Sequence, residues 1–463
     1  MKKILILPVL VLLLSQSACN WFVDGYDVSP NDPTEATHAL LLSASELATF
    51  TVYSGQLARM TNILSQHQAG TDFQFVDIAN YVILEGDLNN EWNNIYSKCL
   101  VNENLLIEQA GDENPYYRGI AKVLKAMALG IATDLWGDVP NREAAQGLQG
   151  SDFYSPAYDA QEVIFADLQD LLSSAITDLS ASPEANAILP GADDLIHEGD
   201  PVKWTKTAWI LKARFAMRLS ERDSEAASKA LNFLSQASLV GPEDDANAIF
   251  GENGNEWNQW YAFRIQRGGY MQMGEFFVEL LKDIDDPRLP FYATQTTDPD
   301  NPYRGTPLGS NDQTTSGIGT YFASQTAPAP MVTYVEALFI EAEAYFRAGN
   351  LESAATTFNE AVKTHVEQVT GEAIPATYEA DQASETAATI SLEKIMTHKY
   401  VASFTQIEAY TDWRRTGIPA LSPNPGGQVS GIPLRLPTAG VERLYNTNAV
   451  VNADLLSPVW WDN

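Results

Sequence analysis

The segment from Tyr334 to Val366 places the strongest constraint on the fold. Its pattern predicts two helices joined at a turn that contains Gly349 and Asn350. Small side chains along both helices allow close approach, and aromatic side chains fill the space between neighbouring turns. One such pair cannot bury its own apolar face. The chain must therefore contain further helical pairs that cover this one.

The small and aromatic positions match those of a tetratricopeptide repeat. They are Ala342, Tyr345, Gly349, Ala354, Phe358 and Ala361. The usual closing proline is missing, and Val366 stands near its place. The pairs that begin at Tyr116 and Trp204 are candidate degenerate copies. The sequence predicts a mainly α fold, built as a scaffold of tetratricopeptide-like helical pairs.

Apolar residues at spacings of three and four predict the helices of this scaffold. They cover residues 87–110, 116–136, 161–179, 202–219 and 391–415. The last helix ends in Arg414 and Arg415, where cations favour a helix C-terminus. We expect these two arginines to cap the helix and to form surface ion pairs.

The helical pattern breaks up between residues 238 and 324. This stretch is rich in Gly, Pro, Asn, Asp and Thr, and residues 298–302 have the composition of a turn. It also carries many aromatic residues, which favour an ordered surface over a linker. We therefore expect an irregular, aromatic-rich insert in the scaffold. A turn is the preferred interpretation of Asp298 to Asn301, and we expect no metal site.

The N-terminus has the pattern of an export signal. Lys2 and Lys3 precede an eleven-residue apolar run from Ile4 to Leu14, interrupted only by Pro8. That run is too short to span a bilayer and is typical of a signal peptide. We expect residues 1–18 to be the leader and residues 19–463 to be the mature domain.

Small residues precede Cys19. The same pattern marks the sites at which lipoprotein signal peptidase cleaves and the new N-terminal cysteine is acylated. Gln16 departs from the usual pattern, because leucine is common three residues before the cysteine. An incidental cysteine after a secretory signal is the alternative interpretation. Two kinds of acyl linkage at Cys19 would give stable membrane attachment. We expect a lipid-anchored bacterial protein.

Charge excludes one class of partner. The 28 basic and 60 acidic residues give a formal charge of −32, and loss of Lys2 and Lys3 with the leader would leave −34. Binding to nucleic acid requires clustered Lys and Arg, so we expect no nucleic-acid partner. The second cysteine, Cys99, lies on an apolar helical stripe and is expected to be buried and inert.

No catalytic motif is visible in the sequence. The five histidines, at positions 38, 67, 197, 365 and 398, have no close metal-ligand spacing. Nucleophile elbows and glycine-rich phosphate loops are absent from the sequence. A carboxylate pair for glycoside hydrolysis is not singled out among the 60 acids. We expect a protein that is not an enzyme and has no cofactor.

Two stretches are candidates for ligand binding, because sugar rings pack on aromatic faces while polar groups bind the hydroxyls. One carries Trp257, Trp260 and Tyr261, and the other carries Asp72, Phe73 and Phe75. The first stretch also fits a short helix whose three aromatics face the core. The same question applies to the second stretch, where Gly70 and the crowded polar residues disfavour helical core packing.

Five segments in order resemble the SusD/RagB-like nutrient-binding outer-membrane lipoproteins of the Bacteroidetes. They are Trp92 and Tyr96 with Asn102 and Asn104, the helix 126–136 ending in Gly137-Asp138-Val139-Pro140, Asp286-Pro287-Arg288-Leu289, the helix end 408–419, and Ile432-Pro433-Leu434-Arg435 with Glu442 and Asn446. The closing segment departs in having Leu436 before Pro437. The resemblance runs from Cys19 to the C-terminus.

The resemblance implies a lid on a SusC-like TonB-dependent outer-membrane barrel, facing the cell exterior. Such a protein captures glycan or peptide and delivers it for uptake by hinge motion. Three features predicted from the residues agree with this resemblance, namely the lipid tether, the repeat scaffold and the aromatic-rich insert. A scaffold lipoprotein for envelope assembly and a lipid-anchored glycoside hydrolase are the alternatives.

Overall fold

The structure is a computed structural model that describes residues 36–462. Cys19 and the predicted leader lie outside these residues. The long helices are α2 His38–Ser54, α3 Gln56–Leu64, α6 Val101–Ala110, α7 Pro115–Trp136, α8 Gln161–Leu179, α9 Pro201–Arg218, α10 Ala226–Ala237, α14 Tyr334–Arg347, α15 Leu351–Thr370, α17 Leu392–Ala402 and α18 Glu408–Thr416. The mainly α fold is confirmed.

Shorter elements connect and cover these helices. The remaining helices are α4 Phe73–Ala79, α5 Asn89–Asn93, α11 Gln259–Gln266, α12 Glu275–Asp283, α13 Leu289–Tyr292, α16 Ala376–Gln382 and α19 Gly440–Tyr445. Three two-stranded antiparallel sheets pair β1 Gln68–Gly70 with β5 Met271–Met273, β2 Val139–Pro140 with β3 Tyr158–Asp159, and β4 Ala246–Ala248 with β6 Ala329–Val332. Residues 238–324, predicted as irregular, thus hold several short elements joined by loops.

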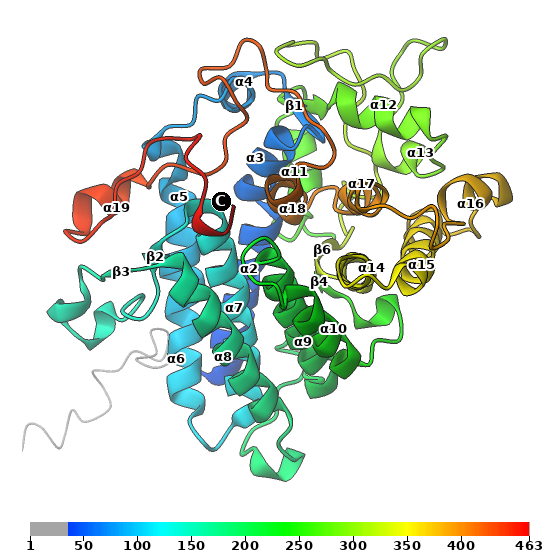
Figure 1. Cartoon of the computed structure of the whole chain (residues 1–463). Helices are drawn as coiled ribbons and strands as arrows, with labels where there is room; N and C mark the ends of the chain where they lie inside the picture. The colour runs from blue at the N-terminus through cyan, green and yellow to red at the C-terminus, as the bar shows by residue number, and fades with distance from the viewer. Residues whose placement is uncertain (1–35, 463) are drawn as a thin grey trace, which may run out of the picture.

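The long helices pack in sequence across the molecule. α7 packs on α8, α9 on α10 and α14 on α15, and each pair also contacts the next one (Figure 1). These are the three helical pairs that the sequence predicts at Tyr116, Trp204 and Tyr334. Small residues permit the contact: a Cβ atom at Gly119 would lie 2.7 Å from the Leu179 side chain. Among residues 36–462, no helix has the length and apolar character needed to cross a membrane.

The predicted helix 391–415 is wrong in one respect, because it is two helices. The break between α17 and α18 contains Thr405, whose φ is +70°. There the Asn62 side chain accepts a hydrogen bond from the Thr405 amide (3.0 Å). The Asn62 side chain thus replaces the helical carbonyl that would otherwise accept a hydrogen bond from the Thr405 amide.

The expected surface role of Arg414 and Arg415 is also wrong. Both side chains are buried. Arg415 Nη2 lies 2.7 Å from Glu343 Oε2 and 2.9 Å from Asp412 Oδ1, and Arg414 donates to the carbonyls of Leu434 and Asp134. These arginines join α18 to α14 and to the end of α7.

Cys99 is fully buried, as predicted. Burial raises the pKa of its thiol well above the usual value, because the charged thiolate is poorly solvated there.

Candidate functional site

The structure places the six predicted binding residues in or next to two short helices, with Trp257 two residues before the start of α11. Asp72 caps α4, its carboxylate accepting from the Phe73 amide at 2.9 Å, and Phe73 and Phe75 lie in the first turn. Trp260 and Tyr261 lie in the first turn of α11, whose cap is Asn258. Trp257 precedes α11 and lies outside it, so the core interpretation of the first stretch holds only for Trp260, the one buried residue of that helix.

A chain of aromatic rings links the two helices. Phe263 of α11 contacts the Phe75 ring edge-on, with centroids 5.0 Å apart. Phe73 stacks on Tyr270 at 4.7 Å. The Arg59 guanidinium lies 4.7 Å from the Phe263 centroid and 6.0 Å from that of Trp260. The rings thus form one continuous cluster between α4 and α11.

Burial separates the predicted residues by role. Phe75 is 0% and Trp260 is 2% exposed, so both side chains belong to the core. Phe73 is 62% exposed, while Trp257 and Tyr261 are half-buried. The exposed and half-buried members are the ones whose rings can reach a ligand.

Trp257 lies in a groove of its own. This groove has a volume of about 680 Å³ and runs between α2 and residues 249–259, with Leu47, Phe50, Ile249 and Phe250 among its lining. The indole of Trp257 donates to the Glu252 carbonyl (2.9 Å) and contacts Tyr261 edge-on. The structure therefore does not bring all six predicted residues to one cavity.

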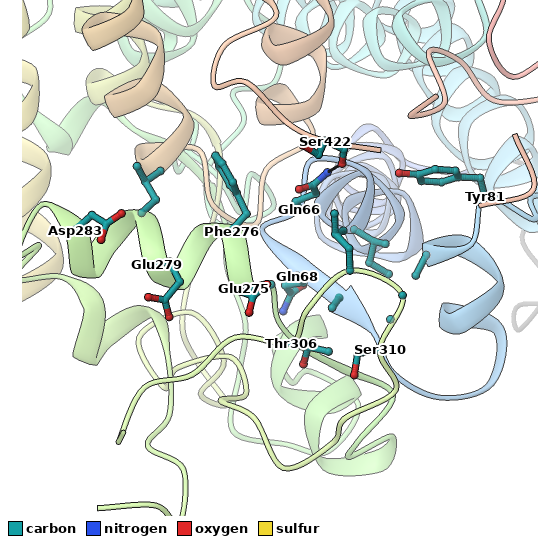
Figure 2. A pocket seen from close by; sticks show the side chains of 18 residues that line it. Gln66, Gln68, Tyr81, Glu275, Phe276, Glu279, Asp283, Thr306, Ser310 and Ser422 are labelled. Atoms are coloured by element: carbon teal, nitrogen blue, oxygen red, sulfur yellow. Dashed lines mark hydrogen bonds between the residues drawn. The ribbon is translucent and has the colours of Figure 1, made fainter. Parts of the chain in front are cut away.

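A different cavity offers a more complete binding site. It has a volume of about 440 Å³, and we call it the α12 cavity. One wall is the segment from Gln66 through β1 to Tyr81, a second is α12, and residues 306–310 and Ser422 close it (Figure 2). Its size falls in the range of small-molecule pockets.

Close backbone contacts hold the walls of the α12 cavity together. Strand β1 pairs with β5, so that Gln68 lies opposite Met273. At the following position, a Cβ atom on Gly274 would lie 2.3 Å from the Gln66 carbonyl oxygen, so only glycine fits. Gln66 has a φ of +61°, and its side-chain Nε2 donates to the Ser422 carbonyl at 2.6 Å.

One buried polar group in this cavity has no partner. Gln68 is 3% exposed, and its Oε1 atom accepts no hydrogen bond from any of the described residues. A buried acceptor without a donor costs about 1–3 kcal/mol. The Oε1 atom is enclosed by protein, so the accessible end of this side chain is its amide nitrogen, which is suited to a ligand that brings an acceptor.

Three carboxylates and two aromatic side chains are also part of the lining. Glu275, Glu279 and Asp283 all come from α12, as Figure 2 shows. Phe276 is half-buried beside them, and the Tyr81 ring lies across the cavity. The Tyr81 hydroxyl accepts from the Asn424 amide (2.8 Å), and burial raises its pKa. Among residues 36–462, no three His, Cys, Asp or Glu residues are placed to hold a metal ion.

Sequence reasoning missed the α12 cavity. The only pattern available was the i, i+4, i+8 spacing of Glu275, Glu279 and Asp283, which places them on one helical face. Nothing local to Gln68 distinguishes it from an exposed glutamine. The nearest predicted residue is Asp72, two positions after Gly70 of the cavity wall.

Comparison with known proteins identifies the family. Residues 30–437 match the SusD-like family described as starch-binding and associating with the outer membrane. The chain belongs to the SusD-like family. The predicted resemblance is thus confirmed, and membership implies an outer-membrane nutrient-binding role.

Solved structures support the same fold. A SusD/RagB family protein from Bacteroides thetaiotaomicron is 24% identical, with a TM-score of 0.78, and the match covers 92% of this chain and 99% of that one. A chitin-binding SusD homologue from Flavobacterium johnsoniae is 20% identical, with a TM-score of 0.77, over 91% and 98% of the two chains. No curated protein matches this chain.

Proposed function

We propose that this SusD-like protein is a surface lipoprotein that binds an oligosaccharide in the α12 cavity and passes it to a SusC-like TonB-dependent transporter. The observation that carries the binding site is a cavity of about 440 Å³ whose lining combines Phe276 and three carboxylates with the free side-chain nitrogen of Gln68. A sugar hydroxyl would accept a hydrogen bond from that nitrogen, while Phe276 would pack on a ring face.

The exposed aromatic side of the cluster extends this site. Phe73 stacks on Tyr270, and Asp72 accepts a hydrogen bond from Gln313 (3.2 Å) just beyond Gly70 of the cavity wall. We propose that Asp72 and Phe73 contact further sugar units and that Phe75 supports them from the core. Trp257 and Tyr261 would form a separate contact, with Trp260 as its buried support.

Binding without bond chemistry fits the lining of the α12 cavity. The cavity offers carboxylates and amides but no histidine, cysteine or lysine among its described lining residues. We therefore propose that the protein is not an enzyme and that it needs no cofactor. Two structural neighbours are described as chitin-binding, so N-acetylglucosamine oligomers are the first ligands to test.

The tether and the partner complete the proposal. Residues 1–18 would be removed as a leader, and residues 19–463 would form one nutrient-binding domain held at the cell surface through acylated Cys19. Purification of the tagged protein from native membranes in mild detergent tests the partner. Recovery of a large TonB-dependent barrel supports the proposal, whereas recovery of other envelope proteins favours an assembly scaffold.

A Gln68→Met variant tests the cavity. Methionine keeps a similar volume but cannot donate a hydrogen bond to a sugar, so affinity should fall by about 1 kcal/mol, or about fivefold. Stability should not fall, because the variant removes an unpartnered oxygen. Gln169→Met on α8 is the control outside the cavity: its stability should fall, because Gln169 Nε2 donates to the Lys212 carbonyl (3.0 Å), but its sugar affinity should not change. Unchanged sugar affinity in Gln68→Met would contradict the site.

A further inference from the structure

We infer that an exposed apolar surface beside α19 is the face through which this protein contacts its transporter partner. The surface, which we call the α19 patch, comes from two segments of the chain. Its members are Leu148, Tyr154, Leu444, Tyr445, Val450 and Val451. The inference rests on the proposed association with a SusC-like barrel, and it adds the surface that forms this association.

All six side chains of the α19 patch are apolar or aromatic and exposed to solvent. Leu148 and Tyr445 are each 77% exposed, and the other four are all more than half exposed. Single exposed apolar side chains are common on protein surfaces and need no explanation. A continuous group of them marks a surface that another molecule covers.

The two segments of the patch lie side by side. Asn448 Nδ2 donates to the carbonyl of Ser155, the residue after Tyr154, at 2.6 Å. Within the other segment, a Cβ atom on Gly147 would lie 3.8 Å from the Tyr154 ring, so the chain next to Leu148 lies against that ring. Figure 1 shows α19 and the loop between β2 and β3 on the same side of the molecule. The six side chains therefore form one surface.

The patch is nearly free of charge, and this indicates which kind of partner fits it. Residues 444–453 carry no charged side chain and residues 145–156 carry only Asp152, whereas 19% of the whole chain is charged. Aromatic side chains with few charges are typical of the centre of a protein–protein interface. An apolar face that binds lipid usually has Lys and Arg beside it. A protein partner therefore fits the patch better than membrane lipid does.

The described chain begins near the patch, which favours a partner in the membrane. The carbonyl of Ala36, the first described residue, accepts from the Gln109 side chain on α6 (2.9 Å). About 7.5 Å earlier along this helix, the Asn104 side chain donates to the Ala144 carbonyl (3.2 Å), at the base of the first patch segment. The chain between Cys19 and Ala36 spans at most about 60 Å. A tether at Cys19 would thus keep this side of the molecule close to an outer-membrane barrel.

The patch is separate from the sugar site. None of its six residues lines the α12 cavity, and Figure 1 shows α12 and α19 at opposite edges of the molecule. A barrel seated on the patch leaves the α12 cavity uncovered. Association with the barrel and binding of sugar can therefore be tested independently.

Photo-crosslinking in native membranes identifies what covers the patch. The full chain, with photoreactive p-benzoylphenylalanine in place of Tyr445, is irradiated in cells, and the crosslinked products are identified by mass spectrometry. The expected product joins this chain to a TonB-dependent barrel. The same group in place of Ile188, which is 53% exposed on the loop after α8, should give no such product.

Paired variants measure how much the patch contributes. Leu444→Ser with Tyr445→Ser removes two members of the patch without changing the net charge. The amount of barrel that co-purifies in mild detergent should fall at least about tenfold, because a few large side chains carry most of the affinity of an interface. Ile188→Ser with Leu189→Ser removes two exposed apolar side chains elsewhere and should leave that amount unchanged. Equal melting temperatures confirm that both variants fold.

The outcomes separate this inference from the proposed function. Equal recovery of the barrel with the wild type and with the patch variant overturns the inference and leaves the proposed partnership standing. A crosslink from position 445 only to lipid or to a second copy of this chain does the same, as does an equal loss in the Ile188 and Leu189 variant. Failure of the wild type to recover any barrel overturns the inference together with the proposed partnership.

Discussion

Trp257 and Trp260 are three residues apart, yet the structure predicts that their removal has very different consequences. Trp260 is 2% exposed, packs in the main core and lies under the Arg59 guanidinium. Trp260→Ala should lower the free energy of unfolding by about 3–5 kcal/mol, the usual cost of deleting a buried aromatic side chain. Trp257 is half-buried and lies on the groove wall. Trp257→Ala should therefore cost only about 1 kcal/mol.

Urea unfolding followed by far-ultraviolet circular dichroism measures both costs, because fluorescence would change with the tryptophan itself. Each free energy comes from linear extrapolation at a common slope, and a changed slope would show an altered unfolded state. Trp260→Phe is a useful control and should recover part of the loss. Equal losses at the two positions, or a larger loss at Trp257, would refute the division into core and groove.

Two predictions concern buried charge. Asp412→Asn should cost about 3–5 kcal/mol by denaturant titration, because it removes the carboxylate partner of buried Lys399 (2.7 Å) and Arg415 (2.9 Å). Asp167→Asn, which breaks an exposed pair, should cost at most about 1 kcal/mol, and equal costs would contradict this account. Burial raises the pKa of Glu103 to about 8. The protonated Glu103 side chain therefore stabilises the fold at low pH, and this stabilisation is lost as the pH rises toward 8. Between pH 5 and 8, the free energy of unfolding of the wild type should fall by about 1.4 kcal/mol per pH unit relative to that of Glu103→Gln. Parallel pH profiles of stability for the two proteins would rule this out.

Much of the scaffold could be predicted from the sequence. The helical pairs follow from local periodicity, and α7 ends at Trp136 as Gly137 and Pro140 indicate. The break between α17 and α18 could not be predicted, because it depends on Asn62, 343 residues away from Thr405. Contacts over such separations leave no local pattern in the sequence.

The burial of Arg414 and Arg415 was hidden for the same reason. A C-terminal helix position is a favourable place for a surface arginine, so the local pattern supports a role that the fold does not use. Partners such as Glu343 and Asp134 come from other helices. The burial of these two arginines therefore follows only from the packing of those helices against α18.

The candidate site was predicted only in part. Aromatic content indicated the two stretches that contain the starts of α4 and α11, but it did not indicate which of their rings are buried. Gln68 gains its interest from being buried without a hydrogen-bond partner, which is a property of the packed structure. The shared helical face of Glu275, Glu279 and Asp283 could have been found from their spacing, although nothing distinguishes these three among the 60 acidic residues of the chain.

The most direct test of the central claim is a crystal structure of the protein with a bound glucosamine-based hexamer. The account predicts sugar density in the α12 cavity, with a ring on Phe276 and a sugar oxygen within hydrogen-bond distance of Gln68 Nε2. Density confined to the groove beside Trp257, with the α12 cavity holding only water, would contradict it.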